Sequence, residues 1–151
     1  MNKILADRLV AMAAHDLETR ERLAEDGSLF DGYNPQMQGV HEANARELDA
    51  IIADIGWPTA QIAGDDGAEA AWLIAQHAIG LPQFQRKCLA LLKCAVAAGQ
   101  APAWQMAMMI DRIHTYEGRR QVYGTSLDWD DGGQLCGSAC KKDPVSGVIG
   151  V

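Results

Sequence analysis

Glycines at intervals of about 20 to 30 residues divide the first 118 residues into five helix-length segments. Gly27, Gly56, Gly80, Gly99 and Gly118 each follow a stretch in which apolar residues recur at helical spacing. Because glycine commonly ends a helix and proline is tolerated in the first turn, this punctuation predicts helix boundaries. The predicted helices cover residues 3–25, 38–55, 67–79, 82–98 and 103–116, with one short turn at 59–63.

The pattern changes after Gly118. Residues 121–125 and 127–129 alternate as strands do, and the run Asp130-Asp131-Gly132-Gly133 is a strong turn signal before residues 134–136. We therefore predict a β-hairpin followed by a poorly ordered tail over residues 137–151. The expected fold class is mostly α: a single-domain helical bundle of about five helices with a C-terminal β-hairpin, spanning residues 1–136.

Length and composition limit the class of protein. A chain of 151 residues suits one domain, and 48% hydrophobic with 22% charged residues is typical of a globular protein. No apolar run approaches the roughly 18–20 residues that cross a bilayer. Asp7 and Arg8 interrupt the N-terminus before a signal-peptide core could form. We therefore expect a cytoplasmic protein that does not enter a membrane.

The net charge of −7 argues against nucleic acid or an anionic membrane as partner, since both need a basic face. The charge is uneven, because residues 1–69 carry 5 basic and 14 acidic side chains, whereas residues 70–151 carry 8 and 6. The acidic half is either a solvated helix surface or a face that orients a partner or a second copy in a homo-oligomer.

Several motifs that would identify a cofactor are missing. The chain has no phosphate-binding loop, no dinucleotide fingerprint and no nucleophile elbow. His41-Glu42 begins like a zinc-protease helix, but Ala45 stands where the second histidine would be. Cys136 and Cys140 have no CxxC pair elsewhere in the chain with which to form a zinc site. We therefore expect neither a cofactor nor a metal site.

Polar residues inside apolar helices are the most informative candidates, because a buried polar group is costly unless it is paired. Gln76 and His77 end the most apolar helix, and Asp111-Arg112 lies among methionines and isoleucines. One interpretation is structural, with a satisfied core histidine and an ion pair between helices. The other is a site in which His77 acts as acid and base, Asp111 or a neighbour orients it, and Arg112 binds an anion.

Other polar side chains share helical faces or lie where a surface position is not obvious. Asp16 and Arg20 are one turn apart, as in an ordinary surface pair, and His41 and Asn44 share a face near a helix start, as in a cap. If the helices form one bundle, a set of these groups can converge on a site in its core: His41, Asn44, Gln76, His77, Asp111 and Arg112. The candidates for substrate binding are therefore Arg112, Gln76, His41, Asn44, Gln85, Asp16, Arg20, Gln121 and Tyr123.

Five short motifs occur together in this order: His41 with Asn44, Gly56-Trp57-Pro58-Thr59, Gln76-His77, Asp111-Arg112 and Tyr123-Gly124-Thr125. The set resembles a bacterial family of uncharacterised proteins, a domain of unknown function, over residues 10–130. The resemblance implies a mostly helical fold and carries no established activity. The chain differs from the family in having Leu17 and Ser126 where glutamine is usual.

These observations leave two functions open. The first is a small hydrolase-type enzyme that uses acid/base catalysis at a polar site in the helical core. The second is a binding module that holds a small molecule or a peptide without converting it. A purely structural network of the same side chains is the third interpretation.

Overall fold

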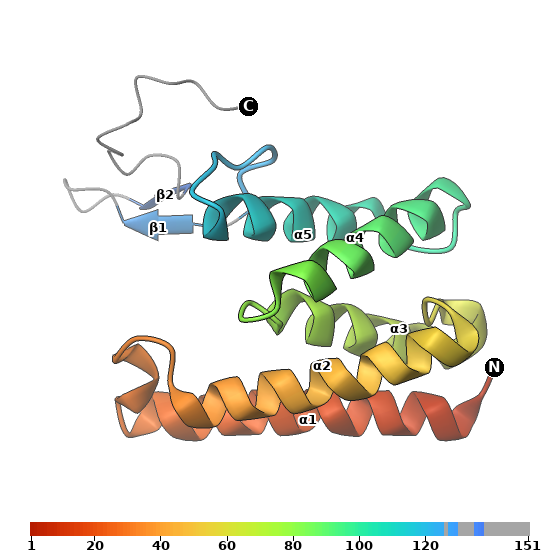
Figure 1. The fold of residues 1–151 in the computed structure, drawn as a ribbon, viewed down its shortest axis with the longest axis horizontal. Helices are drawn as coiled ribbons and strands as arrows, with labels where there is room; N and C mark the ends of the chain where they lie inside the picture. The colour runs from red at the N-terminus through yellow and green to blue at the C-terminus, as the bar shows by residue number, and fades with distance from the viewer. Residues whose placement is uncertain (126, 130–134, 138–151) are drawn as a thin grey trace. The chain divides into compact units, whose positions relative to one another are not determined.

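The computed structural model describes residues 1–125, 127–129 and 135–137. The chain forms two compact units, Met1–Ala101 and a second unit that begins at Pro102. The first unit holds α1 (Lys3–Glu25), a short 3-10 helix η1 (Ser28–Phe30), α2 (Pro35–Ile55), α3 (Ala60–His77) and α4 (Pro82–Ala97). The second unit holds α5 (Ala103–Tyr116), β1 (Leu127–Trp129) and β2 (Leu135–Gly137) (Figure 1). The prediction of a mostly helical protein with five α-helices is confirmed for the described residues.

Two helix starts differ from the prediction for identifiable reasons. α2 begins at Pro35, because the side chain of Asn34 accepts hydrogen bonds from the backbone N–H groups of Gln36 and Met37 and so caps the helix. The predicted turn at 59–63 and the helix after it join into α3 across a kink at Gly64, where φ is 71°. α3 ends at His77, which places this histidine at the last position of the helix.

Small residues let α1 and α3 pack closely along their length. Ala63, Ala71 and Ala75 of α3 are fully buried. At Gly67, a Cβ atom would lie 3.1 Å from the Cα of Ala6 and 2.9 Å from the Cβ of Ala63. α2 lies beside α1 (Figure 1), and the core between the helices of this unit is filled by larger side chains: Leu9, Leu48, Ile74 and Leu92. The close approach brings polar groups of α1 and α3 within hydrogen-bonding distance.

In the second unit, the predicted strand at residues 121–125 is wrong. These residues form an irregular segment whose backbone N–H groups point to a side chain of α5 rather than to another strand. β1 and β2 pair antiparallel, with Leu127 opposite Gly137. The predicted turn at 130–133 lies outside the described residues, so the hairpin as a whole stays a prediction. Of the predicted tail over 137–151, Gly137 belongs to β2 and the rest also lies outside the described residues.

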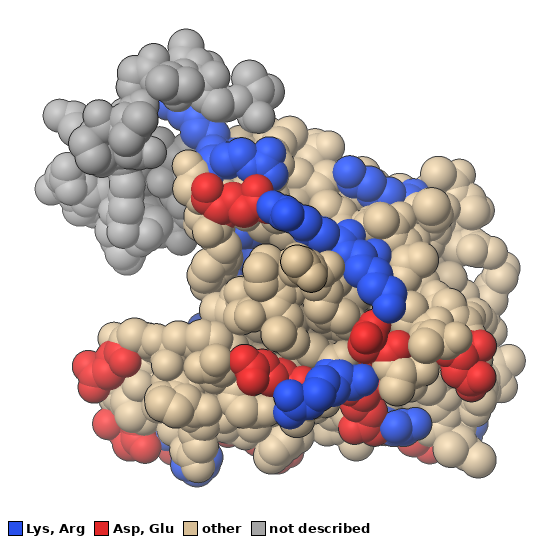
Figure 2. Space-filling view, in the orientation of Figure 1, with Lys and Arg blue, Asp and Glu red and all other residues tan. Residues whose placement is uncertain are grey.

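Charged side chains of both signs are interspersed on the visible face of α1 and α2 (Figure 2). Ion pairs link the helices of the first unit: Arg8 of α1 pairs with Glu47 of α2, and Lys87 of α4 pairs with Asp49 of α2 at 2.6 Å. Within the described residues, none of the helices combines the length and the apolar character needed to cross a membrane.

Candidate active site around Asp16

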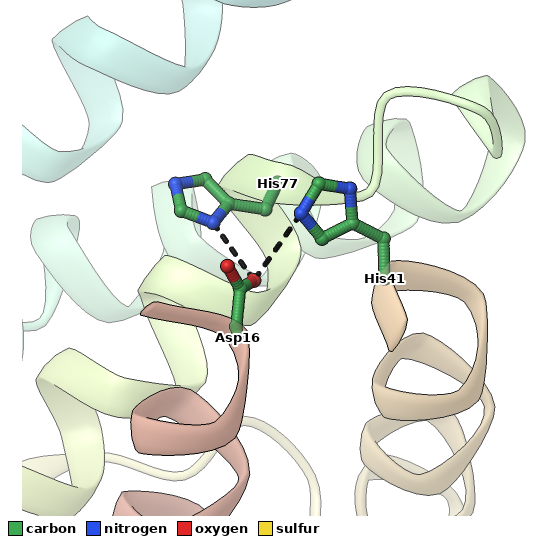
Figure 3. A group of neighbouring side chains, drawn as sticks. All are labelled: Asp16, His41 and His77. Carbon is green, nitrogen blue, oxygen red and sulfur yellow. Dashed lines mark hydrogen bonds and ion pairs between the residues drawn. The ribbon is translucent and has the colours of Figure 1, made fainter. Parts of the chain in front are cut away.

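A buried carboxylate with two histidines is the most distinctive polar cluster of the first unit. Asp16 of α1 is 1% exposed, and its Oδ2 lies 2.8 Å from Nδ1 of His77 and 3.4 Å from Nε2 of His41. Figure 3 shows the carboxylate between the two imidazoles, which come from α3 and α2. The ring centroids of the histidines are 5.4 Å apart. Three residues from three helices therefore meet around one oxygen atom.

Amide side chains hold the helices that carry this cluster. The Nδ2 of Asn44 on α2 donates to the carbonyl of Met12, one turn before Asp16 on α1, at 3.0 Å. The Nε2 of Gln85 on α4 donates to the carbonyls of Ala75 and Gln76 at 3.1 and 3.0 Å. Carbonyls in the last turn of a helix lack partners within it, so Gln85 satisfies the end of α3 next to His77. Asn44 and Gln85, which the sequence predicts as substrate-binding residues, thus link the helices that carry the site.

Tyr33 extends the cluster towards the surface. Its hydroxyl lies 2.6 Å from Nδ1 of His41, and the residue is 36% exposed. The sequence interpretation missed Tyr33, because it stands in the predicted loop before α2 and follows no helical period. The one available signal was its spacing of eight residues from His41, which becomes meaningful only once the loop is seen to fold back on the helix.

The environment keeps Asp16 ionised. Burial alone raises the pKa of a carboxyl group, but the hydrogen bonds and charges of His41 and His77 outweigh it and hold the pKa of Asp16 well below its usual range. An ionised carboxylate only accepts hydrogen bonds. His77 must therefore carry a proton on Nδ1, and in the neutral ring its Nε2 keeps a free lone pair.

The same reasoning assigns the tautomer of the neutral His41 ring. A proton on Nε2 of His41 faces the Asp16 carboxylate, so Nδ1 of the neutral ring accepts from the hydroxyl of Tyr33. The opposite tautomer would direct a lone pair at a carboxylate oxygen. The groups form one chain of polarised contacts that runs from Tyr33 through His41 and Asp16 to His77.

One oxygen of the cluster has no hydrogen bond. Oδ1 of Asp16 is buried and has no partner in the described part of the chain. A buried carboxylate oxygen without a donor is costly, and it marks a place where a cation or a donor group would be stabilised. The ligand-type atoms of Asp16, His41 and His77 all lie within 4.8 Å of one another, so these residues could hold a metal ion.

Asp111, predicted as a catalytic residue, lies in the second unit with a different set of partners. Its Oδ1 accepts from the backbone N–H groups of Val122 and Tyr123 at 2.7 and 2.9 Å. Its Oδ2 accepts from the N–H and the hydroxyl of Thr125 at 2.9 and 2.8 Å. Burial raises the pKa of Asp111, but these four donors outweigh it and lower the pKa below its usual value. The carboxylate that contacts Nδ1 of His77 is that of Asp16, and Asp111 anchors the segment that follows α5.

The remaining predicted residues are distributed over both units. Gln76 is buried beside His77 in the sequence, whereas Arg20 is exposed one turn after Asp16. Arg112, Gln121 and Tyr123 belong to the second unit, where Tyr123 is 54% exposed. Of the residues predicted to converge, His41 and His77 lie together in the first unit. Asp16, whose spacing from Arg20 was typical of a surface pair, is buried between them.

Comparison with known proteins gives the family of the chain and no activity. No curated protein and no solved structure matches it. A family model does match, over residues 4–146, and it describes a family of unknown function, DUF6624. The matched region contains every residue of the cluster around Asp16, together with Asp111 and its partners. The protein therefore belongs to the DUF6624 family of unknown function.

Proposed function

We propose that this protein is a small hydrolase-type enzyme in which His77 is the general base and acid and Asp16 orients it. The observation that carries the proposal is the 2.8 Å contact between Nδ1 of His77 and Oδ2 of Asp16. A buried carboxylate on Nδ1 fixes the tautomer and stabilises the imidazolium that forms during proton transfer. In this arrangement Nε2 of the histidine is the atom that accepts and donates the proton.

Access to Nε2 supports the same role. The side chain of His77 is 16% exposed, and no group in the described part of the chain bonds its Nε2. In the proposed reaction, Nε2 takes a proton from a water molecule as the water oxygen attacks an ester, amide or phosphoester group. The same proton then passes from Nε2 to the leaving group, so His77 ends in its starting state.

The neighbouring groups would support this cycle. His41 faces the same Asp16 oxygen at 3.4 Å and is held by Tyr33, so it limits how far the carboxylate can turn. Arg20 is exposed one helical turn after Asp16, where it could bind an anionic part of a substrate.

The test is a matched pair of histidine variants assayed on a panel of chromogenic esters, amides and phosphate esters. We expect His77→Gln to lower the rate on any substrate that the protein hydrolyses by about 10²–10⁴-fold, the usual contribution of a general acid/base group. His15→Gln is the control, because His15 is an exposed histidine on α1, next to Asp16 in the sequence. Circular dichroism of both variants establishes that they fold.

The alternative function is a module that binds a small molecule or a peptide with the same groups. A compound that raises the melting temperature and emerges unchanged after long incubation favours this alternative. Full hydrolytic activity of folded His77→Gln would contradict the acid/base proposal.

A further inference from the structure

We infer that the Asp16–His41–His77 cluster is also a binding site for a divalent transition metal ion of the Zn²⁺ type, and that the bound metal silences His77 as a base. The second half of this inference rests on the function proposed above. Its starting point is geometric: one carboxylate oxygen and two imidazole nitrogens, carried by α1, α2 and α3, all lie within 4.8 Å of one another.

The donor set selects the class of metal. Two imidazole nitrogens with one carboxylate suit Zn²⁺, Co²⁺ or Ni²⁺, whereas Mg²⁺ and Ca²⁺ prefer oxygen ligands alone. Three protein ligands also match the number found in zinc sites that keep one position open. Because Asp16 is almost completely buried, its charge is available to the metal without competition from bulk water.

The unpaired oxygen of Asp16 is an independent observation that points to a ligand. Its Oδ1 is buried without a hydrogen bond, although its Oδ2 faces both histidines. A metal ion beside the carboxylate would interact with this oxygen, as ligating carboxylates bind through one oxygen or through both. Both histidines contact Oδ2, so Oδ1 is left without a donor.

Tyr33 supplies the outer support that a ligating histidine needs. Histidines that bind metals normally use the second ring nitrogen for a hydrogen bond, which fixes the ring. Here Nδ1 of His41 lies 2.6 Å from the Tyr33 hydroxyl. A hydroxyl both donates and accepts, so Tyr33 can donate to Nδ1 without a metal and accept from it when Nε2 binds the metal.

Metal binding redistributes protons without changing their number. Each neutral imidazole keeps one proton, which moves from the metal-binding nitrogen to the opposite nitrogen of the ring. In His77 the proton moves from Nδ1 to Nε2, so Nε2 becomes a donor and has no lone pair for a water proton. The metal and the general base therefore exclude each other at His77.

The test uses the full chain after chelation and buffer exchange, titrated with Co²⁺ and followed by its visible absorption bands. We expect the wild type and the control His15→Gln to bind Co²⁺, and excess Zn²⁺ to remove the bands. His41→Gln and the nearly isosteric Asp16→Asn should lose the bands while circular dichroism remains helical. Tyr33→Phe should weaken Co²⁺ binding by about 10-fold, because it removes the outer hydrogen bond.

The outcomes separate the metal site from the proposed function. Absence of Co²⁺ binding by the folded wild type would overturn the metal site and leave acid/base catalysis intact. Undiminished binding by folded His41→Gln or Asp16→Asn would overturn the ligand assignment. Co²⁺ binding together with Zn²⁺ inhibition of hydrolysis supports both the metal site and the silencing of His77. Hydrolytic activity that requires the metal would overturn the claim that the metal silences His77.

Discussion

Two buried aspartates, Asp16 in the first unit and Asp111 in the second, show how differently one type of side chain can be used. Both are at most 1% exposed, both lie in helices and both have a pKa below the usual value. Asp111 faces four neutral donors from a single segment, and both of its oxygens are occupied. Asp16 faces two histidines from separate helices, and one of its oxygens has no hydrogen bond.

The difference lies in whether the partners can change their protonation. Backbone N–H groups hold their protons at every ordinary pH, so the Asp111 arrangement has a single pattern of donors. A neutral imidazole can carry its proton on either ring nitrogen, so the Asp16 arrangement has several states that differ in which nitrogen carries a proton. A low carboxyl pKa therefore does not by itself identify a catalytic residue, and the chemical nature of the donors decides.

The largest effect that separates the two aspartates is expected in catalysis. Asp16→Asn should lower the hydrolytic rate by about 10²–10⁴-fold, because an amide cannot stabilise an imidazolium and favours the wrong tautomer of His77. Rates are measured on the substrate found with the wild type, with thermal melting as the check on folding. A folded Asp16→Asn protein that retains more than about half of the rate would remove the distinction between the two aspartates.

The matching change in the second unit should act on stability and local order. Asp111→Asn turns one oxygen into an amide group that faces N–H donors, so we expect a loss of about 2–4 kcal/mol, the cost of leaving buried donors without acceptors. Hydrogen exchange should become faster at the amides of Val122, Tyr123 and Thr125. Unchanged protection of these three amides would show that Asp111 does not anchor the segment.

A smaller effect is expected in how the stability of the same variant, Asp111→Asn, depends on pH. The pKa of Asp111 is lower in the folded than in the unfolded chain, so its stabilising effect is complete above the unfolded pKa of about 4 and is lost as pH falls through the folded pKa. The stability difference between the wild type and Asp111→Asn should be constant between about pH 5 and 7 and shrink below about pH 4. Urea denaturation at several pH values measures it, and a difference that grows on acidification would contradict the assigned direction.

The smallest effect is expected at Tyr33, the outermost member of the Asp16 cluster. Tyr33→Phe removes one hydrogen bond to His41, worth about 1 kcal/mol, and should slow hydrolysis about five-fold. A rate loss equal to that of Asp16→Asn would mean that Tyr33 takes part in proton transfer itself. Comparison of the rate constants of these two variants on one substrate decides between the two roles.

The helices could be predicted from the sequence because their signals are local. Gly27, Gly56 and Gly99 stand next to helix ends, and α1 and α5 have the predicted bounds. The late predicted start of α2 overlooked the cap at Asn34, although Asn-Pro is itself a local signal. The segment 121–125 was misinterpreted, because its alternation resembles a strand whereas its conformation is set by Asp111, more than ten residues away.

The site was only partly predictable, for a related reason. Polar residues on apolar helices marked Asp16, His41 and His77 as candidates, but not which of them would be partners. Pairing depends on how helices pack, and the close contact at Gly67 that aligns α1 with α3 is a property of the folded chain. Two amides predicted to bind substrate, Asn44 and Gln85, donate to backbone carbonyls, a contact with no separate sequence signature.

The most direct test of acid/base chemistry at this cluster is the tautomer of His77, measured from the imidazole nitrogen shifts in a long-range ¹H–¹⁵N NMR spectrum near neutral pH. We expect the proton of the neutral ring on Nδ1, with Nε2 bare, and we expect Asp16→Asn to abolish this preference. The exposed His15 serves as the internal reference for an unconstrained ring. A neutral His77 that carries its proton on Nε2 in the wild type would contradict the role of Asp16 as the group that prepares His77 for catalysis.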